Sequence, residues 1–205
     1  MDNPFKINNC AIILLAAGAS DRMGKPKQLL TYKGKSFLKN MVSVAIHSHC
    51  NPVIVVLGAH ATEMNDEIME EKDNIHIVYN TGWTEGISSS IRCGIETLKK
   101  INPASDGTFL MVCDQPYLTV SLLNDLLNTQ HETGRPIVAA HYSGIAGTPA
   151  LFHKIFFPEL LKLEGDKGAG KILRQHEDLV ATVLFPEGII DIDTPDNYKK
   201  LNNND

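Results

Sequence analysis

The sequence predicts a three-layer α/β sandwich with a largely parallel, mixed sheet. Apolar runs of strand length alternate along the chain with segments whose apolar residues recur at helical spacing. Unbroken apolar runs such as Ala11–Leu15 are typical of strands that are buried on both faces. Repeated alternation of strand and helix favours parallel pairing, with helices covering both faces of the sheet. Glycines at Gly144 and Gly147 indicate a hairpin and therefore some antiparallel pairing.

The first half of the chain supplies three predicted strands and three predicted helices. The apolar runs predict strands at Ala11–Leu15, Val53–Leu57 and Ile75–Tyr79. Helical spacing predicts helices at Phe37–Ile46, Ala61–Met69 and Ser88–Leu98. Ser36 precedes the first of these helices and is a good N-cap residue.

The second half continues the alternation. Apolar runs predict strands at Thr108–Cys113, Ile137–Ala140, Leu179–Phe185 and Gly188–Ile192. Helices are predicted at Thr119–Leu127, Ile155–Leu163, Ala169–His176 and Asp196–Leu201. No linker, repeat or low-complexity segment interrupts the pattern, so residues 1–205 are expected to form a single domain.

Composition narrows the classes of partner. Apolar residues make up 43% of the 205 residues and charged residues 21%, the usual balance of a globular protein. The formal net charge is −5 and Lys and Arg form no cluster, which argues against nucleic acid or an anionic membrane as a partner. A single nucleotide needs only one or two cations and is not excluded.

The expected compartment is the cytoplasm. The four cysteines form no C-x-x-C pair, and three of them flank apolar runs, as buried thiols in a reducing compartment do. The N-terminus shows no export signal, and no apolar stretch approaches the roughly 20 residues that span a bilayer.

Three short motifs follow predicted strands. Ala16–Gly18 follows the first strand, Asp114–Pro116 follows Thr108–Cys113, and Asp193–Pro195 follows the last strand. Ligands of open α/β sheets bind at the carboxyl ends of the strands. The three motifs are therefore expected to open onto one edge of the sheet.

The segment from Leu15 to Lys27 has the composition of a phosphate-binding loop. Its small residues let the backbone approach a ligand, and Arg22 and Lys27 supply positive charge for a triphosphate. It is not a Walker loop, because five residues separate Gly18 from Gly24 and no Lys-Ser or Lys-Thr follows. It also lacks the G-x-G-x-x-G pattern of dinucleotide-binding folds. From the residues alone, a tight turn with a solvated basic edge is the alternative.

Six blocks of sequence, taken in order, resemble the MobA-like nucleotidyltransferases, and most closely the molybdenum cofactor cytidylyltransferase branch. The first reads Leu-Ala-Ala-Gly-x-Ser-x-Arg-Met-Gly-x-Pro-Lys-x-Leu-Leu from Leu15 to Leu30. The other five are Asn80–Arg92, Asp114–Pro116, Gly144–Phe152, Gly165–Ala169 and Asp191–Asp196. Thr81, Ile87 and Gly170 depart from the pattern, and at Gly170 the family frequently has an arginine.

The resemblance implies a fold, a reaction and a set of site residues. The fold is a Rossmann-like sandwich of the nucleotide-diphospho-sugar transferase type. The reaction is transfer of CMP from CTP to the phosphate of molybdopterin, with Mg²⁺ as cofactor and pyrophosphate as product. The resemblance implies that Leu15, Ala16, Ala17, Gly18, Ser88 and Ser89 meet the nucleotide, that Arg22 and Lys27 bind the triphosphate, and that Asp114 and Asp193 hold Mg²⁺.

Ala17 bears on the identity of the base. The family tends to pair Ala-Ala-Gly with cytosine and Ala-Gly-Gly with guanine, so the resemblance implies CTP. GTP-dependent guanylyl transfer and activation of a sugar or polyol phosphate are the alternative reactions. A different class of function is a non-catalytic carrier that hands the finished cofactor to a molybdoenzyme.

Several residues keep a structural interpretation beside the functional one. Asp114 precedes a proline, as ordinary turn residues do, and Asp193 begins a good helix start with Thr194 as N-cap. Arg92 is expected to face either phosphate or solvent, and Trp83 either stacks on a ring or packs the loop.

Overall fold

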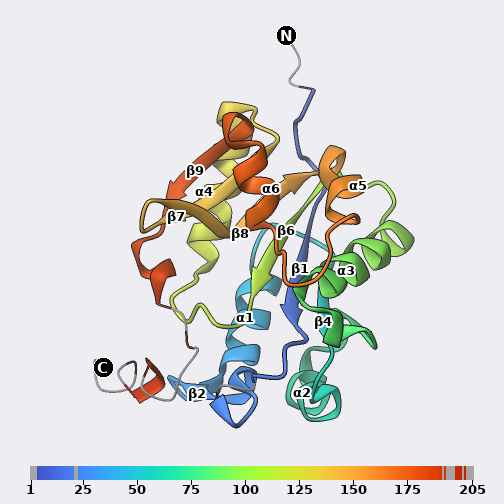
Figure 1. Ribbon diagram of the computed structural model, residues 1–205, viewed down its shortest axis with the longest axis vertical. Coiled ribbons are helices and arrows are strands. Elements are labelled where there is room, and N and C mark those ends of the chain that lie inside the picture. The colour runs from blue at the N-terminus through green and yellow to red at the C-terminus, as the bar shows by residue number, and fades with distance from the viewer. Residues whose placement is uncertain (1–3, 21–22, 191, 193–196, 200, 202–205) are drawn as a thin grey trace.

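The computed structural model describes residues 4–20, 23–190, 192, 197–199 and 201 (Figure 1). Seven strands form one sheet in the order β5-β4-β1-β6-β8-β7-β9. Their bounds are Cys10–Ala16 (β1), Val53–Leu57 (β4), His76–Tyr79 (β5), Gly107–Val112 (β6), Ile137–Tyr142 (β7), Ile145–His153 (β8) and Val180–Leu184 (β9). β8 runs antiparallel to β6 and β7, and the other neighbouring pairs are parallel. The mostly parallel, mixed sheet expected from the sequence is confirmed.

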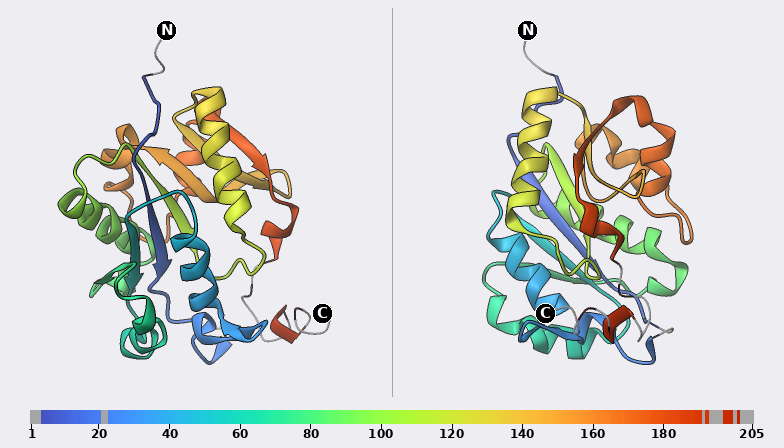
Figure 2. Two further views of the ribbon diagram at one scale, coloured as in Figure 1. Left: turned by 180° about the vertical axis from the view of Figure 1, so that it is seen from behind. Right: turned by 90° about the vertical axis from the view of Figure 1, so that its left-hand side faces the viewer.

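Helices cover both faces of the sheet, as the views from front, back and side show (Figures 1 and 2). One face carries α1 (Phe37–Ile46), α2 (Ala61–Ile68) and α4 (Val120–Thr133), and the other carries α3 (Ile87–Ile101), α5 (Phe157–Leu160) and α6 (Gly170–Gln175). Successive residues of β1 point to opposite faces, so Ile12 packs with the first set and Ile13 with the second. This arrangement confirms the three layers.

Local sequence explains where the helices begin and end. The Ser36 side chain accepts a hydrogen bond from the Lys39 backbone N–H and caps α1 as predicted. α4 begins after the Thr119 cap but runs to Thr133, six residues beyond the predicted end. The extension is stabilised by Gln130, which is fully buried and bonds to the backbone of Ile7 and of Phe5. β2 (Thr31–Tyr32) and β3 (Lys35–Ser36) form a separate small hairpin before α1.

The C-terminal third departs from the prediction in two places. The predicted strand at Gly188–Ile192 is wrong, because Pro186–Ile189 is a 3-10 helix. Gly188 packs so closely on Tyr142 that a Cβ would lie 2.5 Å from its ring, and Pro186 starts the turn. The predicted helix at Ile155–Leu163 is a 3-10 turn, Lys154–Phe156, followed by the single helical turn of α5.

Other C-terminal features agree with the prediction as far as they are described. Residues 197–199 and 201 are helical, and the rest of the predicted final helix lies outside the described residues. Within the described part of the chain, none of the helices combines the length and the hydropathy that a bilayer span requires.

Candidate active site

The carboxyl ends of β1 and β6 lie side by side in the sheet. Leu15 pairs with Val112 in the parallel register, so the residues after β1 adjoin those after β6. The loop after β4 joins them, because the Ala59 N–H donates to the Ala17 carbonyl at 3.0 Å. Two of the three predicted motifs therefore share one edge. The third, with Asp193, lies outside the described residues.

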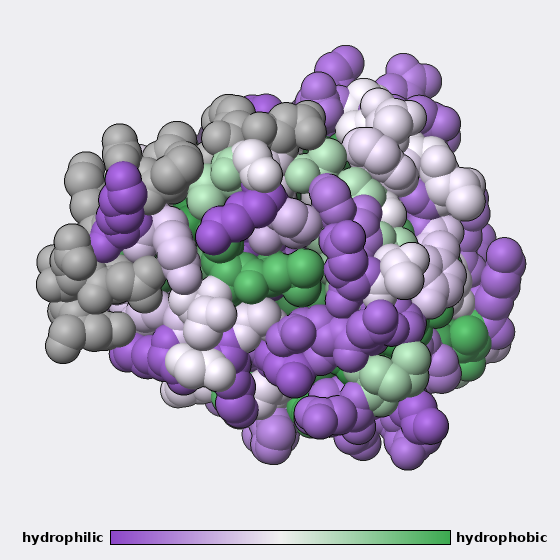
Figure 3. All heavy atoms as spheres, turned by 90° about the horizontal axis from the view of Figure 1, so that it is seen from below, coloured by the Kyte–Doolittle hydropathy of each residue, from purple (hydrophilic) through white to green (hydrophobic). Residues whose placement is uncertain are grey.

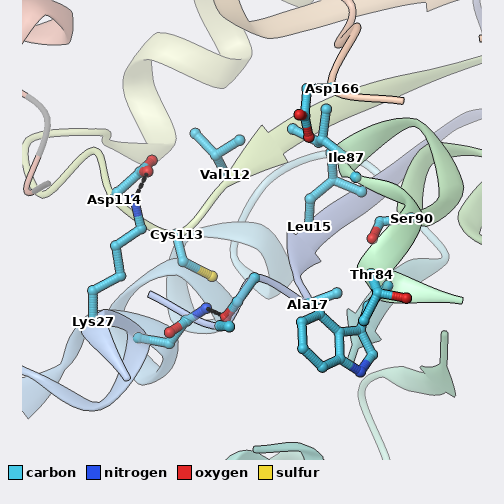
Figure 4. Close-up of a pocket in the computed structure, with 15 residues that line it drawn as sticks. Leu15, Ala17, Lys27, Thr84, Ile87, Ser90, Val112, Cys113, Asp114 and Asp166 are labelled. Atoms are coloured by element: carbon cyan, nitrogen blue, oxygen red, sulfur yellow. Dashed lines mark hydrogen bonds and ion pairs between the residues drawn. The ribbon is translucent and has the colours of Figure 1, made fainter. Parts of the chain in front are cut away.

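A cavity of about 360 Å³ opens at this edge (Figure 4). Five predicted site residues line it: Leu15, Ala17, Gly18, Lys27 and Asp114. Ala16 is buried at the end of β1 and is not part of the lining. Figure 3 views this end of the molecule, where a band of apolar surface lies among hydrophilic side chains. An apolar cavity with a few polar groups is the usual form of a small-molecule site.

Lys27 and Asp114 form an ion pair at one end of the cavity (Figure 4). The Lys27 Nζ lies 2.5 Å from the Asp114 Oδ2, and the two side chains are only 19% and 17% exposed. A 3-10 turn, Lys27–Leu29, aims the lysine, and its backbone N–H donates to the Ser20 Oγ at 3.1 Å. A cation and a carboxylate in contact give this end the polarity needed for phosphate and a metal ion.

Gln28 holds the glycine-containing loop in place. Its side chain is 2% exposed, and its Nε2 donates to the Gly18 carbonyl at 2.8 Å and the Ala16 carbonyl at 3.4 Å. Its Oε1 accepts a hydrogen bond from the Ser20 hydroxyl at 3.1 Å. Gln28 was not predicted from the sequence to act at the site, although its position between Lys27 and two leucines is a signal for a buried polar side chain.

Gly58 was also missed, and it determines how closely the loops approach. A Cβ at this position would lie 2.7 Å from the Ala17 Cβ and 2.8 Å from the Trp83 Cβ. Glycine is therefore required by close approach across the cavity wall. Trp83 packs against the apolar core of the α3 face and also lines the cavity, whereas stacking on a ring of the ligand stays a prediction.

The N-terminal turn of α3 presents Ser90 to the cavity (Figure 4). Ser88 and Ser89, the residues expected near the base and ribose, are buried behind it and do not line the cavity. Ser89 accepts from the Asn80 Nδ2 and donates to the Gly86 carbonyl, both at 2.8 Å. Direct nucleotide contact by Ser88 and Ser89 stays a prediction, while the geometry favours Ser90.

Arg92 is partly buried and bonds to protein groups beside the cavity. Its Nη1 donates to the Leu163 carbonyl at 2.6 Å and to the Ser88 Oγ at 3.2 Å, and its Nη2 pairs with the Glu85 Oε2 at 2.6 Å. The guanidinium therefore joins three segments beside the cavity: the turn before α3, the helix itself, and the segment that leads to Gly165.

Cys113 lines the cavity beside Asp114 but is not a nucleophile. Burial raises the pKa of its thiol far above the usual range, the negative charge of Asp114 raises it further, and Lys27 opposes the shift only partly. The thiolate is the reactive form of cysteine, so this thiol is inert at neutral pH. Cys113 is therefore not expected to supply a nucleophile to this cavity.

Two predicted residues, Arg22 and Asp193, lie outside the described residues. Within the described ranges, no three His, Cys, Asp or Glu side chains gather as a metal site. The Asp114 carboxylate is an oxygen donor of the type that a hard divalent cation prefers. It fits a site completed by further oxygen atoms, such as those of a phosphate.

The sheet order, the crossover helices and the cavity at the carboxyl edge define a Rossmann-like α/β protein. The chain belongs to the family of the MobA-like NTP transferase domain, whose model matches residues 12–179. Membership in this family supports an enzyme that uses a nucleoside triphosphate.

Two relatives that are similar to the chain over most of its length carry the names of different activities. It is 32% identical over 200 residues to nicotine blue oxidoreductase from Paenarthrobacter nicotinovorans, covering 92% of this chain and 94% of that protein. It is 25% identical over 186 residues to molybdenum cofactor cytidylyltransferase from Escherichia coli (strain K12), covering 91% and 92%.

Among solved structures, Rv0371c from Mycobacterium tuberculosis H37Rv superposes with a TM-score of 0.79 at 28% identity, covering 94% of this chain and 97% of that one. A manganese complex of Rv0371c superposes with a TM-score of 0.74. These likenesses agree on the fold and the family and leave the acceptor open.

Proposed function

We propose that the protein transfers CMP from CTP to the phosphate of molybdopterin and releases pyrophosphate, with Mg²⁺ as the cofactor. The observation that carries the proposal is the Lys27–Asp114 pair at one end of the cavity whose other lining groups suit a nucleoside. The similarity to a molybdenum cofactor cytidylyltransferase over most of both chains supports the acceptor. Ala17 supports cytosine through the habit of the family.

The reaction needs positioning and charge neutralisation. An oxygen of the acceptor phosphate attacks the α-phosphorus of CTP, and the bond from that phosphorus to the bridging oxygen of pyrophosphate breaks. The nucleophile comes with the acceptor, which agrees with the inert thiol of Cys113. Lys27 binds the phosphate oxygens and offsets the charge on the departing pyrophosphate, and Arg22 is proposed to assist it.

Asp114 is the described residue that would hold the divalent ion, and Asp193 is proposed as the second ligand. When bound, the ion neutralises phosphate charge and orients the triphosphate. The ammonium group of Lys27 lies beside Asp114, and the ion pair keeps the Asp114 side chain oriented at this end of the cavity.

The test is pyrophosphate release from CTP in the presence of Mg²⁺ and molybdopterin, with GTP in a parallel assay. We expect turnover with CTP, and Asp114→Asn should lower it by about 10²–10³-fold, because a charge-stabilising group is removed. Asp125→Asn, an exposed carboxylate on α4, is the matched control and should be silent. Full turnover by Asp114→Asn would remove this residue from the mechanism.

Two other results would redirect the proposal. Faster turnover with GTP than with CTP would make the protein a guanylyltransferase. Tight binding of the finished dinucleotide cofactor without any turnover would make it a carrier that serves a molybdoenzyme.

A further inference from the structure

One wall of the cavity comes from a segment that is far in sequence from most of the other lining residues. Asp166 lines the cavity together with Ile87 and Ser90, although it lies between α5 and α6 (Figure 4). The segment Leu163–Asp166 is tied to α3 at two points. The Leu163 carbonyl accepts from Arg92 at 2.6 Å, and the Gly165 carbonyl accepts from the Ser88 N–H at 3.2 Å. These two hydrogen bonds, one from the Arg92 side chain and one from the Ser88 backbone, fix the wall and leave the Asp166 side chain to line the cavity.

Gly86 permits this close approach. A Cβ on Gly86 would lie 2.5 Å from the Asp166 Oδ1 and 2.6 Å from the Gly165 carbonyl carbon and oxygen. Gly86 also has a φ of +97°, which side-chain-bearing residues rarely adopt. The segment is therefore seated directly on the turn that starts α3.

Asp166 lies across the cavity from the Lys27–Asp114 pair, with Leu15 and Val112 between the two ends (Figure 4). Lys27 is the cation among the described residues that line the cavity, and its contact with Asp114 offsets the charge of that carboxylate, so the proposed place of the triphosphate and its metal ion is the Lys27–Asp114 end. The nucleoside would then lie toward the Asp166 end. A carboxylate accepts hydrogen bonds and donates none, so the ligand atom it meets must carry hydrogen.

Ser90 supplies the complementary group. Its Oγ accepts a hydrogen bond from the Asn80 Nδ2 at 3.0 Å, which leaves the hydroxyl hydrogen to point elsewhere. Ser90 therefore offers the cavity a donor, and Asp166 offers it an acceptor. Cytosine presents a matching edge, with a ring nitrogen and a carbonyl as acceptors beside an amino group as donor.

We propose that Asp166 determines base specificity by accepting a hydrogen bond from the amino group of the base, beside the donor hydroxyl of Ser90. The inference rests on the proposed use of CTP. Uracil carries a carbonyl oxygen where cytosine carries the amino group, so the same carboxylate rejects UTP. Exclusion of UTP is thus assigned to a residue outside the glycine-containing loop.

The test compares the dissociation constants of CTP, UTP and 2′-deoxy-CTP for the wild-type protein and for Asp166→Asn, by calorimetry in Mg²⁺. An asparagine side chain can donate as well as accept. We expect CTP to bind more weakly and UTP more tightly, so the CTP-over-UTP preference falls by about tenfold or more. Glu164→Gln is the matched control, because it removes the same charge from the same exposed segment without altering the cavity lining.

Two results would overturn the assignment while leaving the proposed function in place. An unchanged CTP-over-UTP preference in Asp166→Asn would exclude the base contact. A loss of preference for CTP over 2′-deoxy-CTP, with the base preference intact, would assign Asp166 to the ribose. Failure of the wild-type protein to bind any of the nucleotides would overturn the proposed function itself.

Discussion

Replacing Gly58 by alanine tests whether the cavity wall is as tightly packed as the contacts indicate. The added Cβ would lie 2.7 Å from the Ala17 Cβ, 2.8 Å from the Ala17 carbonyl oxygen and 2.8 Å from the Trp83 Cβ. These distances fall about 0.6–0.7 Å short of the 3.4 Å at which ordinary contacts begin. All three atoms belong to the backbone or are bonded to it, so relief requires the loops to separate.

Overpacking of this kind costs about 1–3 kcal/mol of folding free energy. For a chain of 205 residues, that loss lowers the melting temperature by about 2–12 °C. Because Ala17 is displaced, we also expect CTP to bind about tenfold more weakly, a loss of about 1.4 kcal/mol. Differential scanning calorimetry and isothermal titration with Mg²⁺ and CTP measure the two effects.

Gly168→Ala is the matched control for Gly58→Ala. A Cβ on Gly168 would meet the Ile87 side chain at 3.6 Å, an ordinary contact, so the free energy of unfolding should change by less than about 0.5 kcal/mol. Wild-type melting temperature and CTP affinity in Gly58→Ala would refute the reasoning, since the wall would then yield without cost.

Three further predictions concern the loop, a helix cap and pH. Gln28→Leu leaves the Gly18 carbonyl without its hydrogen-bond donor, so urea titration should show a free energy of unfolding lower by about 1–3 kcal/mol, and CTP should bind more weakly. Unchanged stability and CTP affinity would contradict the role of Gln28 in holding the loop. Ser36→Ala removes the α1 cap and should lower the free energy of unfolding by about 1 kcal/mol in the same titration. An unchanged free energy of unfolding would show that the cap does not stabilise the protein. Burial raises the pKa of Asp106, but hydrogen bonds from Lys154 and two backbone N–H groups outweigh it and hold that pKa below its usual range. Because the pKa of Asp106 is lower in the folded state, its carboxylate stabilises the fold above about pH 4, and this stabilisation is lost as the pH falls further. Asp106→Asn should therefore make the free energy of unfolding depend less on pH in this acid range. An unchanged pH dependence in Asp106→Asn would contradict the stabilising role of the carboxylate.

The sheet was predictable because its central strands are unbroken apolar runs. Ala11–Leu15 and Val53–Leu57 are buried throughout, so their type and pairing follow from burial on both faces. The end of α4 was not predictable, because the buried bonds of Gln130 to the N-terminal segment come from tertiary contact. The strand expected at Gly188–Ile192 failed for a similar reason, since the packing of Gly188 on Tyr142 forms a turn.

The candidate site was predictable where strand ends carry chemistry and not where distant segments meet. Asp114 was found from the sequence because it follows a buried strand, and Lys27 because it is a cation of the glycine-containing loop, although their direct contact was not predicted. Gly58 was missed because its role depends on the separation between loops. Asp166 lies in the Gly165–Ala169 block, but its place in the cavity lining depends on contact between distant segments. Ser88, Ser89 and Ser90 are all buried serines of α3, but Ser90 lies on the side of the helix that faces the cavity. The sequence does not show which of the three faces it.

A crystal structure of the protein with CTP and Mn²⁺ tests most directly whether this cavity binds a metal–nucleotide complex. We expect the cytosine and ribose between Ala17 and Ser90, the triphosphate on Lys27, and an anomalous manganese peak beside Asp114. A nucleotide bound elsewhere, or a manganese peak remote from Asp114, would contradict the assignment of the cavity as the active site.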